Sequence, residues 1–417
     1  MCSNNYNSDS NRSMLFILML TIVIDVMGFG LVLPLFPDLF LKISVHSLVA
    51  ADTGTFIRYV LYSIGFAIWP IGAFFGTPFL GTLSDKFGRK NIIVTCLIAS
   101  AFSYLIMGWA VYNNLIILFF AGGVLSGFFG GSYDIAQAAA ADISTTGNKA
   151  RNMGWIAFAV AIGYVIGPLI SGFTTESQIF PWFSLNTPFF IAAVLAMINS
   201  IYLMLCFKET YERKDNAKIE FLKVFSAFMF VFNDKRVFRL GLAFFAIVLA
   251  WGLYVISIPL ILQILFHFDI KDIGLLFCLL GAGYAFSILF LQKWFLKRFS
   301  LEKIFIMSAL AVAIVMLIVG IFPNEIFLWF SAFLMGAIEI LNYSCLLALC
   351  SNAVTKDEQG ILMGGIGAMS SVALLASGIL LPLISEFYIP FSITMVAIMY
   401  FISVLIIIYN LKKNKLT

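Results

Sequence analysis

The sequence predicts an all-α membrane protein in which twelve transmembrane helices form two pseudo-symmetric six-helix halves. Three observations lead to this fold class. The 417 residues are 62% hydrophobic and only 11% charged, whereas a soluble protein carries about 25% charged residues. The mean hydropathy of the chain is +1.03, which is typical of a protein surrounded by lipid. Apolar runs of about 20 residues or more follow one another with short polar connections.

Each apolar run is long enough to cross the hydrocarbon core as a helix, which satisfies its own backbone polar groups. The predicted spans are residues 14–37, 59–80, 91–111, 115–140, 153–174, 187–207, 239–265, 273–294, 303–322, 326–350, 361–384 and 388–411. The polar tails are residues 1–13 and 412–417. The charged connection 208–238 separates the halves 14–207 and 239–411. Within it, residues 221–232 predict an amphipathic helix along the membrane surface.

The distribution of Lys and Arg predicts the orientation of the chain. If the N-terminus is cytoplasmic, the external loops contain only Lys42, Arg58 and Lys271, and the other 22 of the 25 basic residues lie inside. Because cytoplasmic loops are enriched in basic residues, this asymmetry places both termini in the cytoplasm. The first apolar run is too long for the core of a signal peptide, so we interpret it as the first span.

The composition also argues against several classes of protein. The basic residues lie in loops between spans, so the net charge of +4 does not indicate a nucleic-acid partner. The six cysteines and two histidines show no disulfide framework and no metal-ligand spacing, so we expect no metal site. No phosphate-binding Gly-x-x-x-x-Gly-Lys-[Ser/Thr] loop is present, so ATP is not expected as an energy source.

Three acidic residues lie inside apolar runs: Asp25 in the first span, Asp134 in the fourth and Glu339 in the tenth. Charged groups inside a membrane are costly and are usually functional. No lysine or arginine near the midplane could neutralise these acids, so we predict that they carry protons. The alternative is that a protonated carboxyl group only links neighbouring helices by a hydrogen bond.

Polar and aromatic side chains near these acids are candidate substrate contacts. Gln137 shares a helical face with Asp134, and Asn342 and Tyr343 share one with Glu339. The two aromatic residues of the seventh span could stack on a planar or cationic substrate, or could simply face lipid or pack. The predicted substrate contacts are therefore Gln137, Trp251, Tyr254, Asn342 and Tyr343.

The densest cluster of charge in the first half is a predicted loop that begins at Gly81 and ends at Lys90. Gly81 and Gly88 would permit close helix approach and a sharp turn. Asp85, Arg89 and Lys90 can pair with one another or with a neighbouring helix end. The alternative is a loop whose positive charges only fix the topology.

The fifth span carries small residues at helical spacing. Gly154, Gly163, Gly167 and Gly172 would let another helix approach closely, and Pro168 interrupts the hydrogen-bond ladder. Glycines in membrane helices are often only packing positions. The adjacent Gly167 and Pro168 make the pattern more specific than a lone pair of small residues.

Taken together, these segments resemble the major facilitator superfamily, specifically its twelve-span drug/proton antiporters and the tetracycline-efflux-like transporters among them. Residues 81–90 match the signature loop between spans two and three at nearly every position. The glycines of span five match a motif regarded as characteristic of antiporters. Residues 25–37 look like the first span of tetracycline-type pumps. The resemblance covers essentially the whole chain.

The resemblance implies a proton-coupled secondary transporter in a bacterial inner membrane, exporting a small, partly hydrophobic drug or metabolite by alternating access. It implies a monomer that uses the proton gradient and needs no cofactor. In the family's fold, spans two and eleven meet at the inner surface. Asp85, with Arg89, is therefore expected to latch the halves together when the cavity opens outward.

One departure from the family pattern concerns span four. Drug antiporters usually carry an arginine there, four residues before a glycine, and counting back from Gly127 reaches Gly123. Span four has no arginine, so proton transfer must be arranged differently, and Asp134 is a candidate for this role. The departure also keeps open proton-coupled uptake of a nutrient such as an amino acid, nucleoside or siderophore. A membrane-embedded enzyme or receptor is a further alternative, although no acid–histidine cluster supports catalysis.

Overall fold

The computed structural model describes residues 8–42, 47–145, 148–176, 178–210 and 223–414. Within these ranges, twelve helices are long and apolar enough to cross a membrane. This finding confirms the predicted number of spans and the all-α fold class. The described residues contain no β-strand.

The N-terminal half consists of α1 (Ser8–Val32), the 3-10 turn η1 (Leu33–Leu35), α2 (Phe36–Phe40), α3 (Thr55–Phe87), α4 (Arg89–Tyr112), α5 (Ile116–Phe129), α6 (Ser132–Asp142), α7 (Lys149–Thr174) and α8 (Thr187–Cys206). The first span comprises α1, η1 and α2: helix α1 begins at Ser8, and the apolar stretch long enough to cross a membrane runs from Arg12 to Phe40. The fourth span comprises α5 and α6, which are separated at Gly130 and Gly131.

The rest of the chain consists of α9 (Lys223–Asn233), α10 (Phe238–Phe266), α11 (Ile270–Phe286), the π-helical turn η2 (Ser287–Leu291), α12 (Gln292–Leu296), α13 (Leu301–Ile321), α14 (Glu325–Asn352), the 3-10 turn η3 (Lys356–Glu358), α15 (Gln359–Ser385) and α16 (Phe391–Asn414). The helix predicted over residues 221–232 is present as α9, although residues 221 and 222 lie outside the described ranges.

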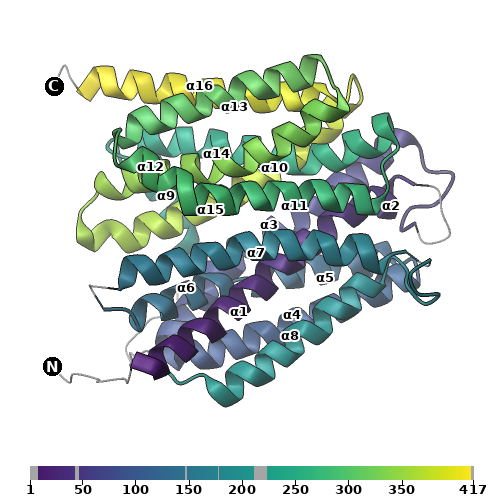
Figure 1. Ribbon diagram of the computed structural model, residues 1–417, viewed down its shortest axis with the longest axis horizontal. Coiled ribbons are helices and arrows are strands. Elements are labelled where there is room, and N and C mark those ends of the chain that lie inside the picture. The colour runs from purple at the N-terminus through teal and green to yellow at the C-terminus, as the bar shows by residue number, and fades with distance from the viewer. Residues whose placement is uncertain (1–7, 43–46, 146–147, 177, 211–222, 415–417) are drawn as a thin grey trace.

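The two halves lie side by side, and both chain termini lie at the same end of the bundle (Figure 1). We call this end the termini end and the opposite one the far end. Two helix pairs join the halves, namely α7 with α11 and α3 with α15.

Polar contacts join the halves toward the far end. The Tyr62 hydroxyl on α3 donates a hydrogen bond to the Ile256 carbonyl on α10 at 2.6 Å. The Gln263 amide on α10 donates to the Asp38 carboxylate on α2. Glycine packing adds to these contacts, because a Cβ at Gly378 on α15 would lie 3.2 Å from Ala67 on α3.

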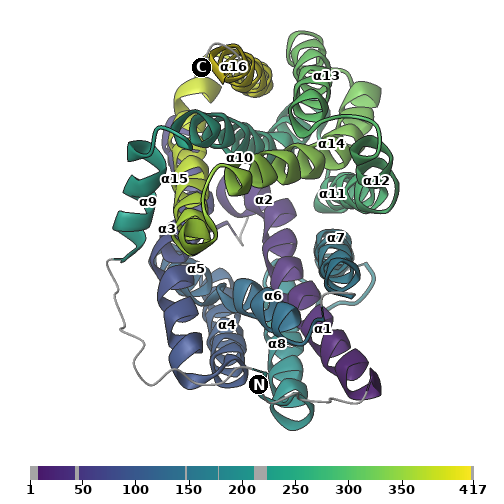
Figure 2. The same cartoon turned by 90° about the vertical axis from the view of Figure 1, so that its left-hand side faces the viewer.

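The halves separate toward the termini end. A Cβ placed at Gly81 on α3, Gly154 on α7 or Gly367 on α15 would meet no atom of another element within 4 Å. The view from the termini end shows the two sets of helices apart around α6 (Figure 2). The described structure is therefore a conformation in which the far end is closed.

The segment from Gly81 to Lys90 is not a loop, and that prediction was wrong. α3 continues through Gly81 to Phe87, and only Gly88 separates it from α4. Gly88 has φ +95°, a conformation that residues with a side chain rarely adopt. The sharp turn thus depends on Gly88 and not on Gly81. The helix can run on past the lipid because its last turn reaches the aqueous termini end.

Helix α9 lies outside the bundle along α15 and beside α3 (Figure 2). Its backbone touches α15 closely, since a Cβ at Gly365 would lie 2.3 Å from the Ala227 carbonyl oxygen. The ring of Phe225 lies 5.6 Å from that of Phe74 and 6.3 Å from that of Phe75 on α3. The amphipathic helix therefore contacts both halves.

Candidate functional site

Asp25 lies on α1 in the interior of the N-terminal half. Its carboxylate accepts a hydrogen bond from the hydroxyl of Ser132, the first residue of α6. The break between α5 and α6 positions this hydroxyl, because close packing on α3 fixes the last turns of α5. A Cβ at Gly127 would lie 2.2 Å from the Trp69 carbonyl oxygen. The glycines around the break therefore serve helix packing and bring α6 against α1.

Asp134 and Gln137 lie on the face of α6 that is accessible, and both side chains are exposed. This face is directed at the C-terminal half, since Asp134 lies within electrostatic range of Tyr343 on α14. The predicted alignment of Asp134 with Gln137 is therefore present in the structure. Ser132 and Asp134, two residues apart, connect the half-buried Asp25 with the separation between the halves.

Glu339 lies on α14 and is buried. Its carboxylate accepts a hydrogen bond from the Tyr400 hydroxyl on α16, so it is anchored within the C-terminal half. Among the described residues, no lysine or arginine forms an ion pair with Asp25, Asp134 or Glu339. Asp25 and Glu339 thus have hydroxyl groups as hydrogen-bond partners and Asp134 is exposed, and none of the three is neutralised by an ion pair with a basic side chain.

Tyrosines from both halves gather between Asp134 and Glu339. The rings of Tyr164 on α7 and Tyr284 on α11 lie 5.3 Å apart across the two halves. Tyr343 lies within electrostatic range of both acids. Tyr133, which precedes Asp134, also interacts with Tyr343 and Tyr164. We call Tyr133, Tyr164, Tyr284 and Tyr343 the tyrosine group.

Of these four tyrosines, only Tyr343 was predicted from the sequence as a site residue. Tyr133 is adjacent to an intramembrane acid, and this position could have indicated it. Nothing in the sequence near Tyr164 or Tyr284 indicated a role, because the two rings come together only when α7 and α11 pack against each other across the two halves.

The predicted substrate contacts fall into two sets. Gln137 is exposed, and Trp251 and Tyr343 are half-buried. Trp251 lies 5.8 Å from Tyr284, ring to ring, and so adjoins the tyrosine group. Tyr254 and Asn342 are each 0% exposed. They lie inside the packed C-terminal helices, where Asn342 accepts a hydrogen bond from Ser308 on α13.

The glycines of the fifth span pack α7 against two partners. A Cβ at Gly163 would lie 2.7 Å from Val26, and one at Gly167 would lie 2.4 Å from the Met27 carbonyl oxygen, both on α1. At Gly172 it would lie 3.1 Å from Lys271 of α11. Pro168 lies inside α7, and its carbonyl oxygen lies 2.7 Å from a Cβ placed at Gly274. A Cβ at Gly154 would have no neighbour within 4 Å, so in this conformation only the glycines nearer the far end pack against other helices.

Arg89 is the centre of a charge cluster at the termini end. Its guanidinium lies 2.9 Å from Asp85 on α3 and 3.4 Å from Asp142 at the end of α6. It also donates to the Ser84 hydroxyl at 2.5 Å. The ion pairs of Asp85 and Arg89 thus connect elements of one half. The latch between α3 and the start of α15 stays a prediction for the conformation in which the termini end is closed.

Glu209 completes this cluster from the segment that follows α8. Its carboxylate accepts hydrogen bonds from the backbone N–H groups of Arg89 at 2.9 Å and Lys90 at 3.2 Å. An anion at this position satisfies free N–H groups and complements the helix dipole. The role of Glu209 was missed, because nothing in its local sequence indicates a contact more than one hundred residues away.

Within the described part of the chain, no group of three or more His, Cys, Asp or Glu side chains could hold a metal ion. The chemistry that the arrangement can support is proton binding at carboxyl groups beside an aromatic, hydroxyl-bearing surface.

Comparisons with known proteins agree with this arrangement. The family model of the Major Facilitator Superfamily matches residues 18–277 and 240–416. The class C tetracycline resistance protein of Escherichia coli is 28% identical over 371 residues, which cover 87% of each chain. The class B protein of the same species is 29% identical over 211 residues, and this alignment spans about half of either chain, 50% of this one and 48% of that one. The crystal structure of the human organic anion transporter MFSD10 (TETRAN) superimposes with a TM-score of 0.71 at 18% identity, covering 95% of this chain and 99% of that one.

Proposed function

Because this chain belongs to the major facilitator superfamily, a family of transporters and not of enzymes, we propose that it is a proton-coupled exporter. It moves a small, partly hydrophobic drug or metabolite across a bacterial plasma membrane by alternating access. The name of the class C tetracycline resistance protein, which is similar over 87% of its length, supports export over uptake. Tetracycline is therefore the first compound to test.

One observation carries this proposal: Asp134 and Glu339, from opposite halves, both lie within electrostatic range of Tyr343, a member of the tyrosine group. A carboxyl group without a basic partner changes its charge when it binds a proton. Such a change of charge at the junction of the halves favours one of the two conformations, open to the inside or open to the outside, over the other. A substrate that binds these two conformations with unequal affinity is thereby coupled to proton binding. Asp25, joined to α6 through Ser132, belongs to the same relay.

The substrate is proposed to bind against Gln137, Trp251 and Tyr343, which retain accessible surface beside the acids. Tyr254 supports this surface from behind, because its ring stacks on Trp251 at 6.4 Å. Asn342 holds α14 on α13 and positions Glu339 one turn away. Aromatic surfaces with a few polar groups are typical of sites for small molecules.

The termini end is proposed to be cytoplasmic, in agreement with the basic residues counted there. The described conformation is then inward-facing, and the protein works as a monomer. Reaction of a cysteine placed in the 412–417 tail with an impermeant reagent, in intact cells and in inverted vesicles, tests the orientation. Reaction in inverted vesicles only is the expected result.

The decisive experiment measures tetracycline-dependent proton flux in proteoliposomes. We expect flux in the wild type, and loss of about tenfold or more in Asp134→Asn and Glu339→Gln, because a positioned proton carrier contributes at least this much. Glu325→Gln, an exposed acid at the far end of α14, is the matched control. Wild-type rates in both central variants would discard the coupling roles, and accumulation instead of extrusion in cells would favour uptake.

A further inference from the structure

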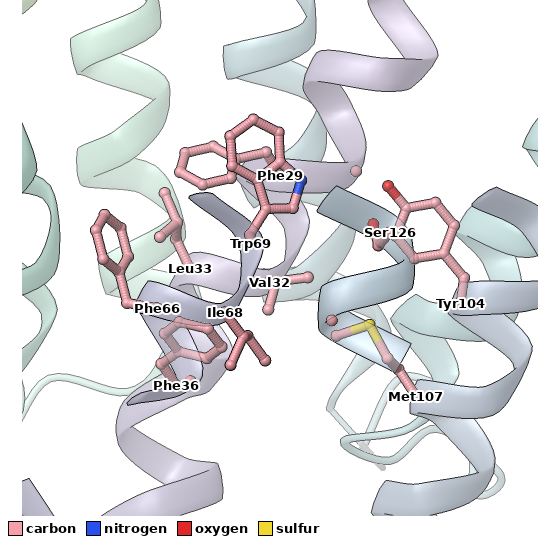
Figure 3. Close-up of a pocket in the computed structure, with 13 residues that line it drawn as sticks. Phe29, Val32, Leu33, Phe36, Phe66, Ile68, Trp69, Tyr104, Met107 and Ser126 are labelled. Atoms are coloured by element: carbon pink, nitrogen blue, oxygen red, sulfur yellow. The ribbon is translucent and has the colours of Figure 1, made fainter. Parts of the chain in front are cut away.

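A small cavity lies within the N-terminal half, apart from the tyrosine group. It has a volume of about 40 Å³ and is lined by residues of α1, η1, α2, α3, α4 and α5 (Figure 3). Its walls are mostly apolar and include Phe29, Phe36, Phe66, Trp69 and Met107. A buried water needs about 10–15 Å³ of such volume, so the space suits two or three waters and not a drug-sized molecule.

One corner of this cavity is polar. The hydroxyl groups of Tyr104 on α4 and Ser126 on α5 line the cavity there, and their oxygen atoms lie together on one side of it (Figure 3). The absence of a side chain at Gly28 makes room for the phenol, since a Cβ there would lie 1.8 Å from the Tyr104 hydroxyl oxygen. Two hydroxyl groups at one edge supply the polar partners that a buried water requires.

The polar corner adjoins Asp25. Gly28 follows Asp25 by three residues and therefore lies on the same face of α1, and Tyr104 is within electrostatic range of Asp25. The cavity continues from there along η1 toward the far end, because Leu33 and Phe36 line it. On its other side, Asp25 bonds Ser132, two residues before the exposed Asp134.

The position where an arginine was expected from the family pattern also lines the cavity. This position is Gly123, and a Cβ there would lie 2.3 Å from the Ile68 side chain. Small residues on α1 and α5 thus leave open the space that surrounds the two hydroxyl groups.

We propose that the Tyr104–Ser126 corner holds water that passes protons between the far end and Asp25, and that Asp25 relays them to Asp134. In the first step a water breaks one O–H bond to protonate the Asp25 carboxylate and takes a replacement proton from the water behind it, so the chain of waters consumes one hydronium ion at the far end. In the second step Asp25 breaks its new O–H bond and Asp134 forms one, which leaves Asp25 as a carboxylate again. Tyr104 is a positioning residue that orients the water. The proposal rests on the proposed function, and it gives proton movement a route separate from the substrate surface.

The groups that face Asp25 are compatible with this route. Cys96 and Tyr104 on α4 and Asp134 on α6 are the titratable groups within its electrostatic range in the described structure. Helix α7 packs on α1 through glycines, and the Asn199 amide on α8 donates a hydrogen bond to the Thr21 hydroxyl on α1. Neither helix therefore places a charged group beside Asp25 through these contacts.

The test follows protonation of Asp25 after a pH jump, by infrared spectroscopy of the purified protein without substrate. The carboxyl band of Asp25 is identified by its loss in Asp25→Asn. We expect Tyr104→Phe, which keeps the ring, to slow protonation by about tenfold or more, and Ser126→Ala to slow it less. Tyr409→Phe on the exposed surface of α16 is the control and should stay within about twofold of the wild type.

Protonation of Asp25 at the wild-type rate in Tyr104→Phe and Ser126→Ala would overturn the proposal. If Tyr104→Phe does not fold, Ser126→Ala decides alone. Loss of substrate binding together with slowed protonation would also overturn it, because the corner would then serve the substrate. Absence of tetracycline-dependent proton flux in the wild type, with the pH-jump effect intact, would instead reject the proposed function and leave the route standing.

Discussion

The carboxylate of Glu209 caps the helix that begins at Arg89, with its Oε1 atom 2.9 Å from the Arg89 backbone nitrogen. The segment after the sixth span is thereby fixed to the start of the third. Because the guanidinium of Arg89 also pairs with Asp85 and Asp142, one residue connects four of the six spans of the N-terminal half at the termini end. Because these contacts tie four spans together, the N-terminal half can move as a unit.

Replacing Glu209 with alanine should destabilise the protein by about 1 kcal/mol, the usual loss when a helix cap is removed. The reason is that the first N–H groups of α4 lose their anionic partner. The thermal unfolding midpoint of the detergent-purified protein measures the effect. Glu386→Ala at the far end, where the acid is exposed, should leave the midpoint unchanged. Equal midpoints for both variants would contradict the cap.

Gly88→Ala and Gly81→Ala should have opposite effects. Alanine at Gly88 must adopt φ +95°, and its Cβ would lie 2.2 Å from Glu209 Oε2, so we expect a loss of about 1–2 kcal/mol or more. Alanine at Gly81 has open space inside a helix and should stabilise it by about 0.5–1 kcal/mol. Unfolding of the paired variants provides the measurement, and a destabilised Gly81→Ala would show that the helix does not continue to Phe87.

The contrast between these glycines shows how far the sequence could predict the structure. Length and hydropathy determine where helices cross a membrane, so the twelve spans and their halves could be predicted. The end of α3 could not, because beyond the lipid the helix is limited by Gly88 and by the distant Glu209, and not by hydropathy.

Asp85→Asn should insert and fold normally but transport more slowly. In the described conformation the loss of the ion pair with Arg89 should cost little stability, since Arg89 keeps Asp142 as a partner. We predict that the carboxylate is needed when α3 approaches the start of α15. Turnover in proteoliposomes and binding of tetracycline to the purified protein separate these effects. We expect reduced turnover with unchanged affinity, and unchanged turnover would leave the segment with a topogenic role only.

The ion pairs of Arg236 should not set the pH dependence of transport. Hydrogen bonds from Arg236 and Thr355 lower the pKa of Glu358 from 4.5 to about 2, and Arg236 also lowers the pKa of Asp234. A carboxyl group whose pKa is lower in the folded than in the unfolded protein stabilises the fold fully at any pH above its pKa in the unfolded protein. This stabilisation is lost only as the pH falls toward 2. Arg236→Gln should therefore cause the same small drop in unfolding midpoint at pH 5.5 and pH 8. A shifted pH midpoint of transport in this variant would contradict the assignment of coupling to the central acids.

Tyr62→Phe should open the far end more often. The variant loses the hydrogen bond to the Ile256 carbonyl across the halves, a contact worth about 1 kcal/mol, which corresponds to about a fivefold shift in population. Distances between spin labels on the far ends of α3 and α10, measured by pulsed electron resonance, report the change. Tyr112→Phe, exposed at the far end of α4, is the control. An unaltered distance distribution in Tyr62→Phe would show that helix packing alone closes this end.

For the candidate site, the sequence indicated the acids but not their surroundings. An intramembrane acid is visible as a charge in an apolar run, and Asp134 with Gln137 follows from helical spacing. The same spacing suggested Asn342 as a substrate contact, but in the structure it accepts a hydrogen bond from Ser308 on a neighbouring helix and lies in the protein interior. Contacts between helices decide which face is accessible, and a single helical repeat does not contain that information.

Helix α9 makes the two flanks of the molecule unequal toward the lipid. It lies against α15 and places Phe225 on Phe74 and Phe75 of α3, whereas the flank formed by α7 and α11 has no such covering helix in the described structure (Figure 2). A hydrophobic compound dissolved in the leaflet at the termini end therefore meets a barrier on one side of the protein only.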